Sequence, residues 1–273
     1  YSYQSGDWNS SNTWTIDPSG SLWISAAVPG AADNAVILNG RTVTINENGK
    51  NCLSLEIKLG GSLDLQATNT HNFGTVSGQG SLKLSSGTFP GGVYTSFVSA
   101  DGGTVEYYNY SGSLSTVQTT YNNVLLSKTD NNATNYTMTL ASNLSIIGDL
   151  TLNRTQGTGI LTFTLGNNAT VRTVTINGNL TNNTGCLIGV GVFNAIHKIN
   201  LYGDLTNYGT IRFTNRTLPW NNTWYNCANI TTTGASDIFF LGATNNTVTC
   251  NGITDFHRFV VDKGTDQTYI LDV

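Results

Sequence analysis

Short segments in which apolar and polar residues alternate recur along the chain. A period of two places every second side chain on one face, so each segment predicts a β-strand with one buried face. Gly, Asn or Asp separates most of these segments, and no long stretch has the apolar spacing of a helix. The clearest strand segments are Val43–Ile45, Leu53–Leu59, Leu63–Leu65, Leu82–Leu84, Val171–Ile176 and Ile199–Leu201.

One short phrase occurs three times, at Ile147–Thr151, Asn177–Thr181 and Tyr202–Thr206. A unit of this length cannot bury its own apolar face, and stacking such units at the strand spacing of ~4.8 Å builds one continuous core. The repeat therefore predicts an all-β fold, a parallel β-solenoid. An antiparallel β-sandwich is the alternative, because it also contains many short strands. A sandwich would not need the same phrase at coil-length intervals.

A longer similarity links Tyr121–Lys128 with Phe256–Lys263, near the end of the chain, and suggests a second, larger repeat. We expect one elongated solenoid over residues 1–273. Residues 1–50 would form an N-terminal cap and the first coil, and residues 51–250 the stacked coils. Residues 251–273 would begin a further repeat or supply a strand that docks on a neighbouring molecule.

The N-terminal segment carries the most specific motifs: Gly6–Trp8, Thr13–Trp14, Val28–Ile37 and Gly40–Ile45. This ordered set resembles the opening of right-handed β-helix domains in large microbial surface proteins, and the related G8-type domain. The resemblance implies a right-handed β-helix. It leaves the function open, because such repeats carry adhesins, surface-layer or sheath proteins and, less often, glycan-cleaving enzymes.

The same segment predicts how the first coil is closed. Trp8 and Trp14 are large apolar groups where a solenoid must shield its end from water, so we expect them to form a cap. A sugar-stacking platform is the alternative for the two indoles. Pro29–Gly30 predicts a turn, and Asp33 can accept backbone N–H groups there.

Composition narrows the partners. Only 10% of the residues are charged and the net charge is −4, so neither nucleic acid nor an anionic membrane surface is an expected partner. Thr (41), Asn (34) and Gly (30) make up 38% of the chain, which suits strands joined by tight turns. No apolar run approaches the ~18 residues of a membrane span. The chain opens on Tyr1 without an initiator Met, so we expect an exported, extracellular protein whose signal peptide has been removed.

Thirteen Asn-x-Ser/Thr sequons make glycosylation a hypothesis, although a chain rich in Asn and Thr also produces sequons by chance. They begin at Asn9, Asn109, Asn132, Asn135, Asn143, Asn153, Asn168, Asn179, Asn182, Asn215, Asn221, Asn229 and Asn245.

Candidate chemistry is sparse. His71, His197 and His257 have no metal-ligand spacing with one another or with Cys, so we expect ordinary surface or strand residues. The glutamates Glu47, Glu56 and Glu106 are far apart, and no local carboxylate cluster has an Arg or Lys beside it. No catalytic site, metal site or cofactor is therefore expected.

One repeated carboxylate position remains. Asp149 and Asp204 occupy matching places in the repeated phrase, with Asn179 between them. Stacked, the three could bind Ca²⁺ through oxygen ligands. We favour a solvent-facing ladder of turn residues, because Gly-Asp and Gly-Asn are common turn pairs.

The four cysteines are disulfide candidates in an exported protein. Cys227 and Cys250 lie about one coil apart in the sequence, and residues stacked one coil apart fall within disulfide range. Cys52 and Cys186 are separated by several coils, too far to pair within one straight solenoid. They could form an intermolecular disulfide between successive subunits, remain as free buried thiols, or pair internally in a bent chain.

These observations favour a non-enzymatic structural protein that assembles with copies of itself into a surface layer, sheath or filament. An adhesin or carbohydrate-binding module that recognises surface glycans is the second hypothesis. A polysaccharide-degrading β-helix enzyme is the third, and a groove with clustered Asp and a basic residue would favour it.

Overall fold

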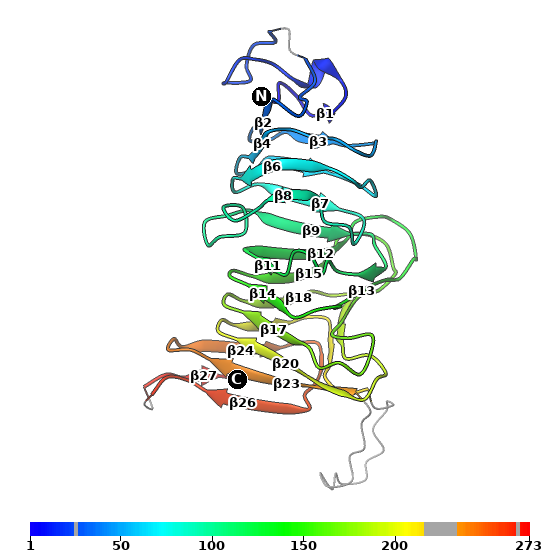
Figure 1. Cartoon of the computed structure of the whole chain (residues 1–273). Helices are drawn as coiled ribbons and strands as arrows, with labels where there is room; N and C mark the ends of the chain where they lie inside the picture. The colour runs from blue at the N-terminus through cyan, green and yellow to red at the C-terminus, as the bar shows by residue number, and fades with distance from the viewer. Residues whose placement is uncertain (25–26, 216–233, 266–267) are drawn as a thin grey trace, which may run out of the picture. The chain divides into compact units, whose positions relative to one another are not determined.

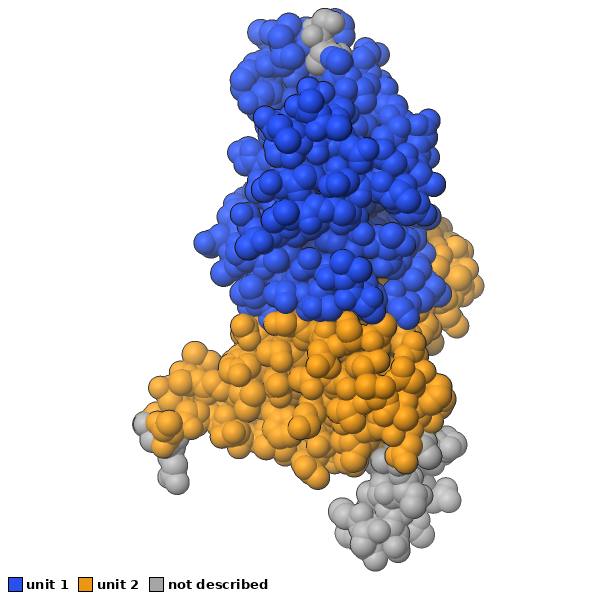
Figure 2. Space-filling model, in the orientation of Figure 1, with its two compact units in different colours: residues 1–127, 146–149 blue, residues 128–145, 150–273 orange. Residues whose placement is uncertain are grey.

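The computed structural model describes residues 1–24, 27–215, 234–265 and 268–273. Within these ranges the protein is almost entirely β-structure, and its only helical element is the short 3-10 turn η1 (Ser11–Thr13). The named strands of the described chain pair in parallel, which confirms the parallel β-solenoid and excludes the sandwich (Figure 1). Contacts divide the chain into unit 1, residues 1–127 and 146–149, and unit 2, residues 128–145 and 150–273 (Figure 2).

Unit 1 is built on two parallel sheets. The first contains β1 (Gly6–Asp7), β3 (Thr42–Thr44), β5 (Ser62–Asp64), β7 (Ser81–Leu84), β9 (Thr104–Tyr108) and β12 (Asn123–Lys128), in that order. The second contains β2 (Asn34–Ile37), β4 (Ser54–Ile57), β6 (Asn72–Ser77) and β8 (Gly91–Val93). Two short strands, β10 (Gly112–Ser113) and β11 (Thr120–Tyr121), complete the unit.

Unit 2 has three parallel sheets, so each of its coils has three sides. The strand orders within the unit are β15 (Leu150–Arg154), β18 (Leu180–Asn182), β21 (Leu205–Asn207), β24 (Asn246–Cys250) and β27 (Leu271–Asp272) in one sheet. The second sheet runs β13 (Tyr136–Thr139), β16 (Leu161–Thr164), β19 (Cys186–Gly189), β22 (Thr210–Arg212) and β25 (Ile253–Asp255). The third runs β14 (Leu144–Ile146), β17 (Thr173–Ile176), β20 (Ala195–Leu201), β23 (Gly234–Leu241) and β26 (Arg258–Asp262).

The repeated phrase marks successive coils, as the sequence predicts. Leu150 is in register with Leu180, and Leu180 with Leu205, so the interval between successive phrases is one coil in each case. All three leucines are buried. In unit 1 the corresponding inward column, also buried, is Val43, Leu63, Leu82, Val105 and Val124.

The larger repeat is not structural. Tyr121–Lys128 contains β12 of the first sheet of unit 1, whereas Phe256–Lys263 contains β26 of the third sheet of unit 2. The two segments have a similar pattern because each contains a strand between an aromatic residue and a buried lysine. The aromatic residue is Tyr121 in one segment and Phe256 in the other, and the lysines are Lys128 and Lys263. The strands within residues 251–273 pair with those of the preceding coil and so continue the sheets of unit 2.

The two tryptophans of the N-terminal segment pack against each other inside the fold. Trp8 and Trp14 are buried and lie edge to face, with ring centroids 5.0 Å apart. Each indole N–H finds a backbone carbonyl: Trp14 donates to Trp8 at 2.8 Å, and Trp8 to Pro29 at 3.3 Å. Asp33 accepts the N–H of Gly30 at 2.9 Å, which fixes the turn. Because both rings are inside, a sugar-stacking role for these tryptophans is wrong.

A buried amide ladder fastens the coils of unit 2. Asn182 and Asn207 are fully buried, and Asn182 Nδ2 donates to Asn207 Oδ1 at 2.8 Å. Asn207 Nδ2 then donates to Ile253 O at 3.0 Å and Thr254 Oγ1 at 2.8 Å. The amide groups pair the polar atoms of three coils at a corner where the strands end.

Replacing Asn207 with Ala should destabilise the protein by about 2 kcal/mol, because buried polar partners in two neighbouring coils lose their hydrogen bonds. Asn200→Ala is the matched control: Asn200 is half-buried and its side chain makes a long hydrogen bond, 3.5 Å, to Thr175. Denaturant unfolding measures both changes in the free energy of unfolding. Equal effects of the two substitutions would contradict a structural role for the buried ladder.

Candidate functional site

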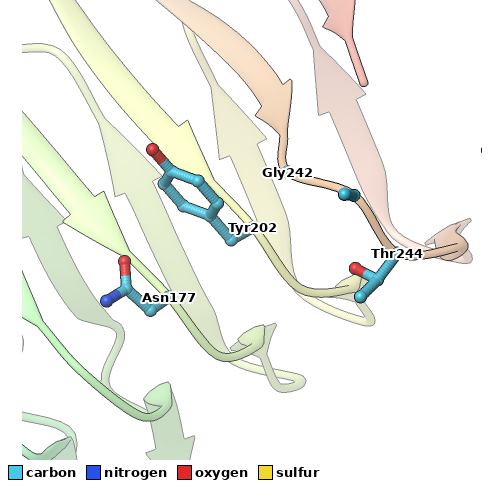
Figure 3. A pocket seen from close by; sticks show the side chains of 5 residues that line it. Asn177, Tyr202, Gly242 and Thr244 are labelled. Carbon is cyan, nitrogen blue, oxygen red and sulfur yellow. The ribbon is translucent and has the colours of Figure 1, made fainter. Parts of the chain in front are cut away.

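A shallow hollow of about 460 Å³ lies where the chain of unit 2 turns at the ends of β17, β20 and β23 (Figure 3). Its lining includes Asn177, Tyr202, Gly242 and Thr244. The Tyr202 side chain is 38% exposed. A Cβ on Gly242 would come within 3.0 Å of that ring, and Gly242 has a φ of +87°, so glycine suits both the turn and the close approach of the tyrosine. An aromatic face beside an amide and a hydroxyl group is the chemistry that a small polar ligand such as a sugar requires.

The repeated carboxylate position serves as a turn ladder. Asn179 Oδ1 accepts the N–H of Asp204 at 2.9 Å, and Asp204 Oδ1 accepts the N–H of Thr247 at 2.8 Å. Asp149, in unit 1, donates its own N–H to Asn123 Oδ1 at 2.9 Å. Among the described residues, no group of three or more His, Cys, Asp or Glu side chains could hold a metal ion. These side-chain oxygen atoms join one coil to the next.

An ionic network on the outer face of the first sheet of unit 1 was not anticipated from the sequence. Glu106, largely buried, contacts Lys83 Nζ at 3.3 Å and accepts the Ser127 hydroxyl at 2.5 Å. Tyr108 donates to Asp64 at 2.8 Å, and Lys83 Nζ lies 5.3 Å from the centroid of the Tyr108 ring. Because Asp64, Lys83 and Glu106 are aligned in register on β5, β7 and β9, stacking brings them together.

This network contains the carboxylates and the basic residue that a polysaccharide-cleaving site requires. Its groups bond chiefly to one another, so the arrangement is explained as a brace across four strands. The other two glutamates lie elsewhere and form local ion pairs, Glu47 with Lys50 and Glu56 with Lys58. Neither joins the network.

Two of the three histidines are buried acceptors for the backbone. His71 Nδ1 accepts the N–H of Lys50 at 3.1 Å, and His197 Nδ1 accepts the N–H of Arg172 at the same distance. Burial, with the charge of Lys50, lowers the pKa of His71 to about 4. Burial, with the charge of Arg172, also lowers the pKa of His197. We expected ordinary surface or strand residues, and that expectation did not include the backbone hydrogen bond that each of these two rings accepts.

The third histidine is different. His257 is only partly buried and its Nδ1 lies 2.8 Å from the buried carboxylate of Asp237. Arg258 approaches the other oxygen of the same carboxylate at 3.5 Å. All three belong to the last coils of unit 2.

The cysteines are placed as follows. Cys52 and Cys186 are free, buried thiols, and burial raises the pKa of each to about 12. Neither sulfur is placed where a neighbouring subunit could reach it, so their arrangement matches the alternative of free buried thiols. Cys250 is exposed and is in register with Asn207, so the coil that ends there is longer than the segment from Cys227 to Cys250. Cys227 itself lies outside the described residues, and the disulfide stays a prediction.

Most described sequons are open to solvent. Asn182 is the exception: it is fully buried in the amide ladder, so glycosylation there is wrong. Asn109, Asn153 and Asn215 are half-buried, and Asn221 and Asn229 lie outside the described residues. The exposed candidates are Asn9, Asn132, Asn135, Asn143, Asn168, Asn179 and Asn245.

Among the described residues, each unit exposes apolar side chains that neighbour a buried part of the fold. In unit 2 the inward column Ile176, Leu201 and Phe240 is fully buried, but its next member, Val261 on β26, is 53% exposed. Phe259 on the same strand is half-buried.

In unit 1, Ile16, Leu22 and Trp23 are 64%, 64% and 47% exposed on one loop. The loop is well organised, because the carboxylate of Asp17 accepts the backbone N–H groups of Ser19, Ser21 and Leu22 at 2.9–3.1 Å. It therefore presents its apolar side chains from a defined backbone.

Comparison with known proteins gave no relative: no family model, curated protein or solved structure matches the chain. Among the described residues, no helix is long and apolar enough to span a membrane.

The two buried histidines should make the fold sensitive to acid. A pKa below the unfolded value of ~6.5 means that the unfolded chain takes up the proton first. The stability that the neutral His71 ring provides is therefore present above about pH 6.5 and is lost as the pH falls toward about 4. The lowered pKa of His197 acts in the same direction. Replacing His71 with Asn keeps an acceptor near Nδ1 and removes the titration, so it should reduce the loss of stability between pH 7 and pH 4 by about 2 kcal/mol. An unchanged pH profile of urea unfolding would contradict this role.

Proposed function

We propose that this chain is a non-enzymatic extracellular structural protein that assembles with copies of itself. The observation that carries the proposal is the uncovered core at β26. Through the preceding coils of unit 2 this column stays buried, and at Val261 it meets solvent. Burial of apolar surface is the main driving force for association, and strand edges that end a sheet are templates for further pairing.

A second copy is the partner that we propose for this surface. Within the described chain, the last strands β25, β26 and β27 each pair on one side only, so their backbone groups and apolar side chains can accept another parallel coil. The apolar loop of unit 1, with Leu22 and Trp23, offers a complementary surface on the neighbouring copy. Contact between unlike surfaces is heterologous and generates a filament or ring, consistent with a layer, sheath or fibre.

Replacing Val261 with Lys should abolish this association, because a charge would replace apolar surface at the contact. Val117→Lys is the matched control, because Val117 is 90% exposed on unit 1 and belongs to neither apolar surface. We expect concentration-dependent assemblies for the unsubstituted chain and for Val117→Lys, and monomers for Val261→Lys. Sedimentation velocity and electron microscopy measure this. A monomeric unsubstituted chain at all concentrations would exclude self-assembly.

Glycan binding by an adhesin-like surface is the second candidate, and the Tyr202 hollow favours it. The exposed ring, the Asn177 amide and the Thr244 hydroxyl lie on three successive turns of unit 2 (Figure 3). Together they provide a stacking surface and hydrogen-bonding groups for a neutral sugar.

Tyr202→Ala should remove binding to neutral glycans on an array, because the stacking surface is lost. Tyr208→Ala is the control: Tyr208 is 48% exposed and does not line the hollow. Equal glycan binding by both variants, or none by the unsubstituted chain, would exclude this site.

A further inference from the structure

A buried primary amine lies at one corner of unit 2. Lys263 follows β26 and is 8% exposed. Its Nζ donates to Leu241 O at 3.1 Å and to the side-chain oxygen of Asn246. Among the described residues no carboxylate lies within ion-pair distance of it. Burial lowers the pKa of Lys263, although the nearby Asp204 acts in the opposite direction.

The side-chain amide of Asn246, which accepts a hydrogen bond from this amine, has partners at both its oxygen and its nitrogen. Asn246, which begins β24, is 9% exposed. Its oxygen also faces the Thr244 hydroxyl at 3.4 Å, and its Nδ2 lies 3.3 Å from Asp204 Oδ1. The carboxylate of Asp204 is fixed in place by the N–H of Thr247 at 2.8 Å. An amine on the oxygen side and a carboxylate on the nitrogen side therefore converge on one side-chain amide.

We propose that Lys263 and Asn246 react to form an isopeptide bond between Nζ and Cγ, with Asp204 transferring the proton. The uncharged amine attacks Cγ, the new N–C bond forms, and the bond from Cγ to Nδ2 breaks. In the adduct both nitrogens are bonded to Cγ, so Asp204, whose Oδ1 lies 3.3 Å from Nδ2 before the reaction, takes the proton that the attacking nitrogen loses and delivers it to Nδ2. Nδ2 then leaves as ammonia. No oxidant, metal or further reactant is needed, since one amine and one amide become one amide and one ammonia. The inference does not depend on the proposed function.

Lys128 provides a comparison within the same unit. It is also buried and lies 3.3 Å from a side-chain amide oxygen, that of Asn132. However, Asp130 forms a direct ion pair with Lys128, and the same carboxylate accepts the amide of Asn132 at 2.9 Å. The Lys128 amine is engaged by the Asp130 carboxylate, and this contact opposes its attack on the amide. The Lys128 site should therefore stay unreacted.

The bond would join the start of β24 to the segment after β26. These strands belong to two sheets, and the cross-link would close the chain between Asn246 and Lys263 into a covalent loop. It would hold the last coil on unit 2 where its core is least covered. We expect the cross-linked coil to resist proteolysis more than the variants that cannot react.

Mass spectrometry of the purified full-length chain tests the proposal. The unsubstituted protein should weigh less than its sequence by one ammonia molecule, and its tryptic digest should contain a branched peptide joining Asn246 to Lys263. Lys263→Arg, Asn246→Ala and Asp204→Asn should each have the sequence mass. Asp204→Asn keeps an acceptor for the Thr247 N–H, so its fold is preserved for the comparison. Lys128→Arg is the control and should retain the mass loss.

Two outcomes would overturn the proposal. One is a sequence mass for the unsubstituted chain after prolonged incubation in the folded state. The other is a lost ammonia without the branched peptide, which would place the loss in a succinimide formed by another asparagine. Persistence of the branched peptide in Asp204→Asn would exclude the proton-transfer role of that carboxylate while leaving the bond itself.

Discussion

Register between neighbouring coils is the constraint on which the rest of this structure depends. Each strand obtains its backbone hydrogen bonds from the strands of the coils on either side, and each inward side chain is covered by the residues in register with it. Leu180 is buried because Leu150 and Leu205 lie on either side of it in the same column. A coil that lacks one neighbour must cover its core by other means. Trp8 and Trp14 do so in unit 1, whereas Val261 in unit 2 is left half exposed.

The same constraint explains how a chain with few charged residues stabilises the turns between its strands. At a corner the strand ladder ends, and a backbone N–H must find an acceptor in the adjacent coil. Asn179 accepts such an N–H from Asp204, and the buried amides of Asn182 and Asn207 link neighbouring coils on the inside. His71 and His197 belong to this set, because their Nδ1 atoms also accept a backbone N–H. A neutral amide or imidazole supplies the acceptor at lower desolvation cost than a carboxylate.

The sequence predicts the parts of this fold that repeat. The alternating segments and the phrase at Ile147, Asn177 and Tyr202 were enough for the parallel solenoid and for the lengths of two of its coils. Contacts between residues of neighbouring coils were harder to predict, because the number of residues in a coil varies with the length of each turn. Lys83 meets Glu106 because one short coil separates them, whereas Cys250 meets Asn207 only after a much longer one. Neither length is visible in the alternation of apolar and polar residues.

It was also difficult to predict from the sequence which side chains of the shortest strands are buried. Alternation would place Asn182 inside with Leu180, yet its sequon suggested a surface position, and the structure follows the alternation. The burial of Lys263 and Lys128 could not be inferred in the same way, because a lysine at the end of a strand normally reaches solvent. A buried lysine that faces an amide and lacks a carboxylate partner needs a reason to be there. At Lys128 the ion pair with Asp130 supplies that reason, and at Lys263 covalent capture by Asn246 would supply it.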